Sequence, residues 1–308
     1  MGHKILIVCS SRAREGGHYI NEQVNDLRDA GCDVHLFYMR GRGLTGYLRS
    51  YLPLINVIKS IKPDIVHAHY GLSGLVAALL PFRKVILTVH GGDIYTWPNR
   101  VMTMMASRLS AHVIAVSNDI AQMLKKHRRV TVIPCAVNVK LFEPASRASA
   151  REKLGMNHDD PLILFSSRFD NKSKNSALAL KAVSLAGREG SLKELRDRSR
   201  TEIALLLNAA DMLLLTSNYE GSPQIVKEAM ACNIPIVSTD VGDVSKNISG
   251  LKGCYICSND PAAIAESINK AFLFRREGQA TGGRERLMEL GLMPEAVTKK
   301  ILEVYGNL

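Results

Sequence analysis

Short, nearly continuous apolar runs recur along the chain, and a polar loop and a helical pattern separate most of them. Runs of this length are typical of strands buried on both faces of a parallel sheet, whereas an alternating run is typical of a half-buried strand. The predicted strands are residues 4–9, 32–38, 63–69, 84–90, 112–117, 130–134, 161–167, 211–217 and 234–238, with 253–257 as an edge strand. Strands that alternate with helices predict an α/β fold built on parallel sheets.

Helical periodicity fills most intervals between these runs. The clearest case places Ile20, Val24 and Leu27 on one apolar face and ends at Gly31, because glycine accepts the left-handed backbone that terminates a helix. A second helix begins at Pro223, whose missing N–H would have no partner in a first helical turn. Further helices are predicted over residues 52–61, 118–126, 145–154, 177–185, 260–272 and 294–305.

The chain has 308 residues, a length that suggests two domains of ordinary size. Phe142 and Pro144 end the first domain, so residues 1–144 and 145–292 are predicted as the two domains and residues 293–308 as a closing helix. Residues 187–202 are rich in charge, and only 191–195 indicate a strand there. Internal repeats and low-complexity segments are absent from the sequence.

The composition of the chain indicates which kind of partner it binds and in which cellular compartment it works. Forty Lys and Arg residues against 29 Asp and Glu give a net charge of +11, which favours a nucleotide diphosphate, an anionic lipid surface or a nucleic acid. Most of the six cysteines stand singly in apolar segments, as buried thiols do in a reducing compartment, and Cys254 and Cys257 form a lone C-x-x-C pair without zinc partners. The first apolar run is too short for a signal peptide, and no run reaches the ~18 residues of a membrane span. We therefore expect a cytoplasmic protein.

Two carboxylates, Glu220 and Glu228, bracket a Gly/Ser/Pro loop and the start of the helix at Pro223. This helix start lies between two predicted parallel strands, so it offers backbone N–H groups at the edge where open α/β sheets bind ligands. At ~1.5 Å rise per residue, a ligand along the helix would meet the two carboxylates at points about 10 Å apart. That spacing suits a nucleotide sugar better than an acid/base pair across one bond. Two Glu residues at such a spacing are more often exposed to solvent than part of a binding site. The choice between these two interpretations therefore depends on the sequence around them.

The stretch from Ala210 to Val244 resembles the E-x7-E motif of the retaining GT-B glycosyltransferases of family 4. It contains Ala-Asp-Met-Leu-Leu-Leu-Thr-Ser, Glu-Gly-Ser-Pro, Lys-Glu-Ala-Met-Ala-Cys, Pro-Ile-Val-Ser and Asp-Val-Gly-Asp-Val. The resemblance implies two Rossmann-like, doubly wound parallel-sheet domains facing across a cleft, with a last helix that returns to the first domain. It also implies that the donor sugar is held by Glu220 and by the backbone of Gly221, Ser222, Pro223 and Gln224, and that Glu228 hydrogen-bonds the ribose.

Arg168 and Lys174 follow a predicted strand and precede a helix, where a guanidinium fork and an ammonium can hold a diphosphate. A solvated charge run is the alternative, and the resemblance favours the phosphate clamp, which would stabilise the leaving diphosphate without a metal. No Asp-x-Asp metal signature is present, so we expect neither a metal nor a cofactor beyond the donor. Family members carry a longer segment around residues 187–202, so the second domain is predicted to be shortened.

Candidate residues of the first half lie at strand ends. Gly16 and Gly17 close the first loop, and the resemblance assigns them to donor phosphate and acceptor. It places His90, which precedes Gly-Gly-Asp93, near the anomeric carbon of the donor sugar.

His67 and His69 share one face of their strand but lack a third ligand, which favours a structural role over a metal site. Asp93 is a candidate to orient the loop or the acceptor, and Trp97 either lines the acceptor side or anchors the core. After Pro134 the family pattern Asn-Gly-Val-Asp is replaced by Cys-Ala-Val-Asn, which puts the contact made there in doubt.

Residues 39–54 are basic and aromatic, with Arg40, Arg42, Arg49, Tyr47 and Tyr51. Such a segment is a candidate for peripheral contact with an anionic membrane on the cytoplasmic face, and the alternative is a solvated loop that leads into a packed helix.

The hypothesis drawn from this sequence is a retaining glycosyltransferase that moves a sugar from a nucleotide diphosphate sugar to a carbohydrate or lipid-linked acceptor, in polysaccharide or glycoconjugate biosynthesis. One alternative is a nucleotide-sugar epimerase on the same fold, which would convert the donor without an acceptor. The other is a non-catalytic binding protein, for which we would expect a broken donor site and basic-aromatic clusters elsewhere. Nucleic acid is not expected as a partner. The sugar, the base, the acceptor and the oligomeric state are open at this point.

Overall fold

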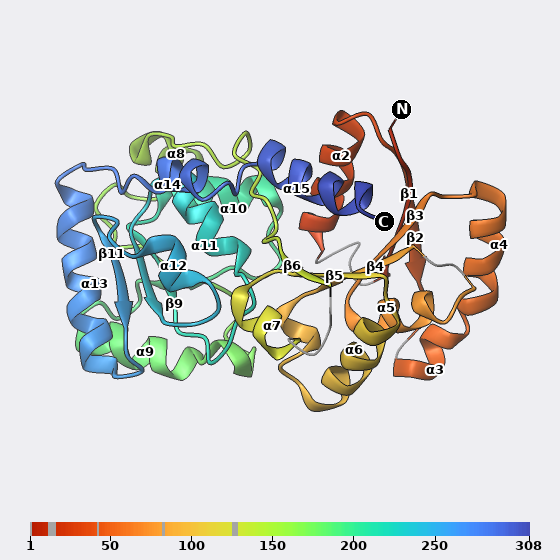
Figure 1. The fold of residues 1–308 in the computed structure, drawn as a ribbon. Helices are drawn as coiled ribbons and strands as arrows, with labels where there is room; N and C mark the ends of the chain where they lie inside the picture. The colour runs from red at the N-terminus through yellow and green to blue at the C-terminus, as the bar shows by residue number, and fades with distance from the viewer. Residues whose placement is uncertain (1, 12–16, 42, 82–83, 125–128) are drawn as a thin grey trace. The chain divides into compact units, whose positions relative to one another are not determined.

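The computed structural model describes residues 2–308 except 12–16, 42, 82–83 and 125–128. The chain divides into two compact units (Figure 1), one formed by Met1–Ala136 with Pro294–Leu308 and the other by Val137–Met293. The first unit thus ends at residue 136, where the sequence pattern places a boundary after residue 144. The closing residues 294–308 belong to the first unit.

Six parallel strands form the sheet of the first unit, in the order β2-β1-β3-β4-β5-β6. Its strands are β1 (Lys4–Ser10), β2 (Asp33–Met39), β3 (Ile65–His69), β4 (Val85–Val89), β5 (His112–Ala115) and β6 (Val130–Val132). Its helices are α2 (His18–Asp29), α3 (Gly43–Leu48), α4 (Tyr51–Ile61), α5 (Gly71–Ala78), the 3-10 turn η1 (Gly91–Asp93), α6 (Trp97–Leu109), α7 (Asn118–Met123) and α15 (Pro294–Gly306).

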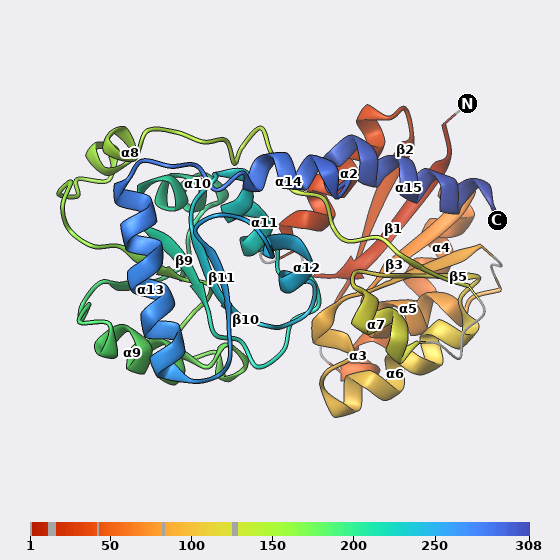
Figure 2. The same ribbon diagram turned by 60° about the vertical axis from the view of Figure 1, so that its left-hand side comes forward.

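Alternate residues of the central strands point to opposite faces of this sheet. Ile5 and Ile7 of β1 join a cluster with α2 and α15, whereas Leu6 and Val8 join a cluster with α4 and α5. Figures 1 and 2 show α2 and α15 on one side of the sheet and α3 to α7 on the other. Both faces are therefore covered, which explains why β1 reads as a continuous apolar run.

Five parallel strands form the sheet of the second unit, in the order β11-β10-β9-β7-β8. Its strands are β7 (Ile163–Phe165), β8 (Leu192–Glu194), β9 (Met212–Leu215), β10 (Ile236–Thr239) and β11 (Cys254–Cys257). Its helices are α8 (Arg147–Lys153), the 3-10 turn η2 (Lys172–Lys174), α9 (Ser176–Leu185), α10 (Arg200–Ala209), α11 (Gln224–Ala231), α12 (Val244–Ile248), α13 (Pro261–Arg276) and α14 (Gly283–Glu289).

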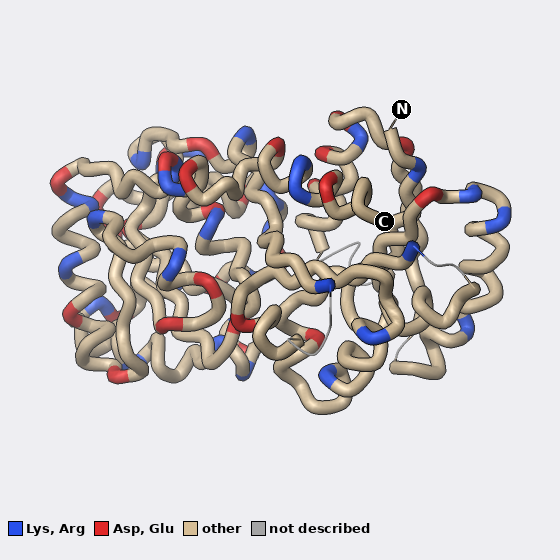
Figure 3. Tube along the Cα trace, viewed as in Figure 1, with Lys and Arg blue, Asp and Glu red and all other residues tan. Residues whose placement is uncertain are grey.

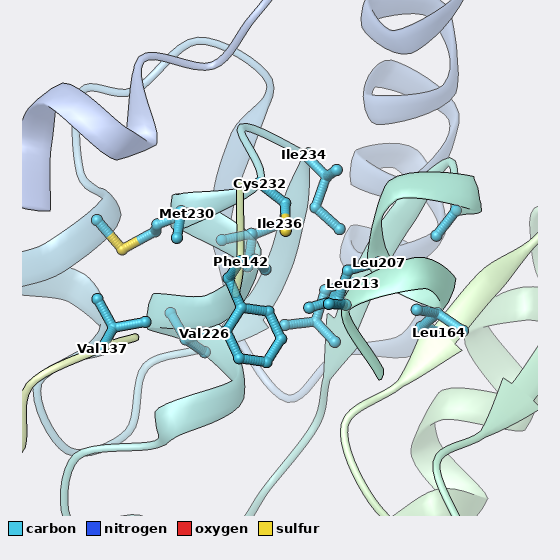
Figure 4. Packing of buried hydrophobic residues seen from close by; sticks show 14 of the residues in the cluster. Val137, Phe142, Leu164, Leu207, Leu213, Val226, Met230, Cys232, Ile234 and Ile236 are labelled. Carbon is cyan, nitrogen blue, oxygen red and sulfur yellow. The ribbon is translucent and has the colours of Figure 1, made fainter. Parts of the chain in front are cut away.

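The second sheet is also packed on both faces. Leu164 and Leu213 join a large cluster with Phe142, Val226 and other residues of the surrounding helices (Figure 4). Ile163 and its neighbours on the opposite face pack instead against α9 and α13. The prediction of two doubly wound parallel-sheet domains is confirmed.

The sequence pattern missed six of the described helices: α3, α5, α6, α10, α12 and α14. Two of them cross closely because Gly71 of α5 leaves no room for a side chain, since a Cβ there would lie 1.9 Å from Thr103 Oγ1 of α6. The buried face of α6 is formed by the small residues Thr103, Ala106 and Ser107, so the side that packs in the core lacks the large apolar residues that mark a buried helix face. Pro223 is the residue preceding α11 rather than its first helical residue, a small correction.

Candidate functional site

In the second unit, the loop after β9 holds Glu220 between two donors. Lys174 of η2 forms an ion pair with Glu220 Oε1, and Ser217 Oγ donates to the same oxygen at 2.7 Å. Thr216 Oγ1 ties the loop to η2 by donating to the backbone carbonyls of Lys174 and Asn175, at 3.0 Å each. Two residues that are 46 positions apart in the sequence, both singled out from it, therefore meet at the carboxyl ends of β7 and β9.

The backbone that follows Glu220 is clamped by the loop after β10. Gly242 has a φ of 59°, and a Cβ at this position would lie 2.5 Å from the carbonyl oxygen of Gly221, so only glycine fits. Ser222 Oγ donates to Asp243 Oδ2 at 2.6 Å and accepts from Lys227 Nζ at 3.0 Å. Burial raises the pKa of the Asp243 carboxyl, and the nearby Lys227 ammonium opposes that shift. The loop and the first turn of α11 are thus held by a buried polar network.

Glu228 is buried in α11 and pairs with a residue that the sequence pattern did not identify. Arg200 Nη2 lies 2.8 Å from Glu228 Oε1, and the Arg200 guanidinium lies 4.6 Å from the centre of the Phe142 ring. Ser199 and Glu202 form a capping box that starts α10 and places Arg200 in its first turn. That S-x-x-E signal was readable in the sequence and marks the helix start. Arg200 therefore belongs with Glu228 among the candidate residues.

Arg168 has a different partner from Lys174. Its side chain is 52% exposed and forms a fork with Asp170, with Nε at 3.0 Å from Oδ1 and Nη2 at 2.6 Å from Oδ2. Arg196 also donates to Asp170, at 3.1 Å. The hydrogen bonds raise the pKa of Arg168 and lower that of Asp170. The two cations of the predicted phosphate clamp are thus each engaged by a separate carboxylate, Asp170 for Arg168 and Glu220 for Lys174.

In the first unit, His90 follows β4 and lies against a column of rings. His69 Nδ1 and His90 Nε2 are 3.2 Å apart, and the rings of His67 and His69 stack at 4.6 Å. His67 bonds Tyr305 of α15 through Nδ1 and Thr88 through Nε2, at 2.7 Å each. Burial lowers the pKa of His69 to about 3 and that of His67 well below its usual value. These two imidazoles are neutral, so their contacts position rings rather than balance charge.

Two tyrosines that the sequence pattern did not identify complete this edge. The rings of Tyr19 and Tyr70 lie 5.1 Å and 4.7 Å from that of His90, and their hydroxyls contact each other. Tyr70 has a φ of 70°, a conformation that costs a non-glycine residue energy and is concentrated at functional sites. Burial raises the pKa of Tyr70 to about 12. Gly17 precedes α2 and its carbonyl accepts from Ile20 N at 2.8 Å, whereas Gly16 lies outside the described residues.

Asp93 is buried beneath the same loop. Its Oδ2 accepts from the Gly71 backbone N–H at 3.0 Å, and Thr103 Oγ1 donates to its backbone carbonyl at 2.8 Å. Burial raises its pKa to about 7, although three backbone N–H groups favour the ionised form. Trp97, four residues further along the chain, is 76% exposed, so the interpretation of Trp97 as a core anchor was wrong.

Within the described ranges, no group of three His, Cys, Asp or Glu side chains is arranged to hold a metal ion. Because both ring nitrogens of His67 are already engaged by protein groups, that residue is a poor ligand. Among the helices described, none combines the length and the hydropathy needed to cross a bilayer.

Two family models match the chain. "Glycosyltransferase Family 4" matches residues 1–141, and "Glycosyl transferases group 1" matches residues 194–272. Among curated relatives, the D-inositol 3-phosphate glycosyltransferase of Mycobacterium marinum is 25% identical over 257 residues, covering 67% of this chain and 55% of that protein. The putative teichuronic acid biosynthesis glycosyltransferase TuaC of Bacillus subtilis is 26% identical over 248 residues, covering 70% and 64%. The chain thus spans less than two thirds of these two relatives.

Solved structures show the same fold. Sucrose-phosphate synthase from Thermosynechococcus elongatus superposes with a TM-score of 0.84 at 17% identity, covering 99% of this chain and 98% of that chain. Anabaena HepE, solved in complex with UDP, superposes with a TM-score of 0.77 at 16% identity. The match covers 99% of this chain and 100% of the HepE chain. The same protein is also represented in complex with UDP-glucose.

Proposed function

We propose that the chain, which two glycosyltransferase family models match over residues 1–141 and 194–272, transfers a sugar from a nucleotide diphosphate sugar to an acceptor hydroxyl, with retention at the anomeric carbon. The observation that carries the proposal is the network of Lys174, Glu220 and Ser217 beside the start of α11. It combines a cation, a carboxylate and backbone N–H groups at the ligand-binding edge of a parallel sheet.

The proposal assigns the charged end of the donor to the second unit. Lys174 and the first turn of α11 stabilise the leaving diphosphate, and Arg168 exchanges Asp170 for a phosphate oxygen when the donor binds. Glu220 accepts hydrogen bonds from the donor sugar, and Glu228, oriented by Arg200, accepts them from the ribose. The complexes of HepE with UDP and UDP-glucose and the ADP complex of Arabidopsis starch synthase IV, which share this fold, support a nucleotide diphosphate as ligand.

The first unit is assigned to the sugar and the acceptor. His90, whose Nε2 lies 3.2 Å from Nδ1 of the neutral His69, presents a hydrogen-bonding ring to the sugar. In the transfer step the bond between the anomeric carbon and the diphosphate oxygen breaks, and the acceptor oxygen bonds to that carbon on the same face. The acceptor proton passes to the departing phosphate oxygen, which lies on that face, so no further base is needed. A carbohydrate or lipid-linked alcohol satisfies this chemistry.

The test is a thermal-shift screen of UDP, GDP and ADP on the full chain, followed by donor turnover with and without acceptor sugars. A nucleotide at about 100 times its Kd stabilises the folded state by about 2.7 kcal/mol, which one of the three should reach. Glu228→Gln should abolish this ligand-induced shift, whereas Glu285→Gln, at an exposed position of α14, should retain it.

Each outcome separates the alternatives. Transfer to an acceptor supports the proposal, and conversion of the donor to an epimer without an acceptor would identify an epimerase. Nucleotide binding with no turnover on any acceptor would favour a binding protein. The absence of a shift with all three nucleotides would overturn the donor assignment.

A further inference from the structure

Three imidazoles form a column at the carboxyl edge of the first sheet. His67 and His69 lie two residues apart on β3, and His90 follows β4 directly. The ring centres of His67 and His69 are 4.6 Å apart and those of His69 and His90 are 5.5 Å apart, with interplanar angles of 23° and 22°. His69 is therefore the middle ring, and it connects the other two.

The two ring nitrogens of His69 have different surroundings. Its Nδ1 lies 3.2 Å from His90 Nε2, whereas no residue in the described part of the chain offers a hydrogen-bond partner to its Nε2. The side chain is completely buried, and burial lowers the pKa of His69 to about 3. A neutral imidazole carries a single N–H. The hydrogen of His69 therefore lies either on Nδ1, within the contact to His90, or on the buried Nε2.

The burial of Nε2 distinguishes between these two tautomers of His69. With the hydrogen on Nε2, a buried N–H donor would have no acceptor among the described residues. Folded proteins rarely leave a buried N–H group without an acceptor, and they leave acceptors unpaired somewhat more often. The contact with His90 Nε2 offers the hydrogen an acceptor if it lies on Nδ1. The Nδ1–H tautomer is therefore favoured.

The surroundings of the column suit uncharged rings. Neither β3 nor β4 contains Lys, Arg, Asp or Glu, so the charged residues marked in Figure 3 lie outside both strands. His67 Nδ1 contacts the Tyr305 hydroxyl and its Nε2 contacts the Thr88 hydroxyl, at 2.7 Å each. The Asp93 carboxyl holds the loop after β4 through the backbone N–H of His90. Hydrogen bonds to uncharged groups thus order the rings of β3.

We propose that His69 is a positioning residue for His90: its Nδ1–H donates to His90 Nε2 and fixes His90 as an uncharged ring that carries its hydrogen on Nδ1. The consequence for catalysis rests on the proposed function, in which His90 bonds the donor sugar. A ring whose Nε2 already accepts bonds the sugar by donating from Nδ1. His90 then orients a sugar oxygen, and it cannot take a proton at Nε2 without losing the bond to His69.

Nitrogen NMR of the imidazole rings in the full chain tests the direction of this hydrogen bond without any turnover. A ring nitrogen that carries hydrogen and one that only accepts differ in chemical shift, and the spectra of His69→Asn and His90→Gln assign the two rings. At neutral pH we expect both rings to carry hydrogen on Nδ1 and none on Nε2. A hydrogen on Nε2 of either ring would overturn the proposal.

Two variants of similar shape test whether the donor matters for transfer. His69→Asn keeps an N–H donor near the position of Nδ1, and His69→Leu removes it. We expect His69→Leu to lower kcat by about tenfold, as the loss of one hydrogen bond does, and His69→Asn to recover most of that loss. His90 should keep its hydrogen on Nδ1 in His69→Asn and divide it between both nitrogens in His69→Leu. Equal kcat values for the two variants would overturn the positioning role.

Nucleotide binding separates this proposal from the proposed function. The nucleotide found in the thermal-shift screen should stabilise both variants as it stabilises wild type, because Lys174 and Glu220 lie in the second unit, and this shift also shows that the variants fold. His158→Leu, at an exposed position, is the control and should keep the kcat of wild type. If no nucleotide bound, the proposed function would fail, whereas the ring spectra of wild type would still decide the direction of the hydrogen bond.

Discussion

The two sheets share one strand order through five strands, yet the side chains at their carboxyl edges differ in charge. At the edge of the first sheet, neutral imidazoles and phenols contact one another, with His69 and Tyr70 beside His90. At the edge of the second, ion pairs dominate, with Lys174 on Glu220 and Arg200 on Glu228. Both edges adjoin the point where the strand order reverses, which is the general ligand-binding position of such sheets.

Under the proposed function, this difference assigns two kinds of chemistry to two copies of one fold. A neutral, buried edge suits hydroxyl groups, because a hydrogen bond there requires no counter-charge. A charged edge suits a diphosphate, because cations already held by carboxylates can exchange one anion for another. The physical distinction lies in the pairing of buried groups rather than in the backbone, which is doubly wound in both units.

The largest expected effect comes from Asp93→Asn, which tests whether the groups buried at the carboxyl edge of the first sheet are uncharged. The pKa of the Asp93 carboxyl is raised from 3.8 to about 7 in the folded protein. Between these two pH values the folded state therefore binds more protons than the unfolded state. The contribution of this carboxyl to stability is full below 3.8 and is lost as the pH rises through about 7. This variant should therefore gain stability relative to wild type by about 4 kcal/mol from about pH 4 to about pH 8.

Urea unfolding at several pH values measures that difference. Asp119→Asn, at an exposed position in the first turn of α7, is the control and should show no such trend. Parallel pH profiles for Asp93→Asn and wild type would show that the buried carboxyl titrates normally.

A smaller effect tests the charged edge, through Lys174→Met. The substitution removes the cation from Glu220 and from the proposed leaving diphosphate, so we expect kcat/KM for transfer to fall by about 10²–10³. Lys172→Met is a matched control, because Lys172 lies in the same 3-10 turn and is exposed. Equal losses in both variants would assign the effect to the turn rather than to the Lys174–Glu220 pair.

The smallest effect comes from Asp170→Asn, which releases the guanidinium of Arg168 from its fork. If Arg168 exchanges Asp170 for phosphate, calorimetry should show the nucleotide found in the thermal-shift screen binding a few-fold more tightly to this variant, and less tightly to Arg168→Ala. The melting temperature should hardly change, because both side chains are exposed. Unchanged affinity in both variants would remove Arg168 from the donor site.

Much of the second edge could be predicted from sequence because its residues are carried by one contiguous motif. Residues 210–244 supply β9, the loop with Glu220, α11 with Glu228, and β10 in order. The partners of these residues were harder to find. Arg200 lies on α10 in a charge-rich stretch, and Tyr19, Tyr70 and His90 come together from three separate segments.

Sequence alone determined the α/β class, the two doubly wound sheets, the resemblance to family 4 and the stretch around Glu220, because apolar period and turn chemistry are local properties of the chain. Tertiary structure decided which charges are paired, which histidines are neutral and which face of α6 is buried. These depend on desolvation and on contacts between residues far apart in sequence, and no local pattern encodes them. In α6, for example, the small residues Thr103, Ala106 and Ser107 are buried and Trp97 is exposed, because the helix packs closely on Gly71 of α5.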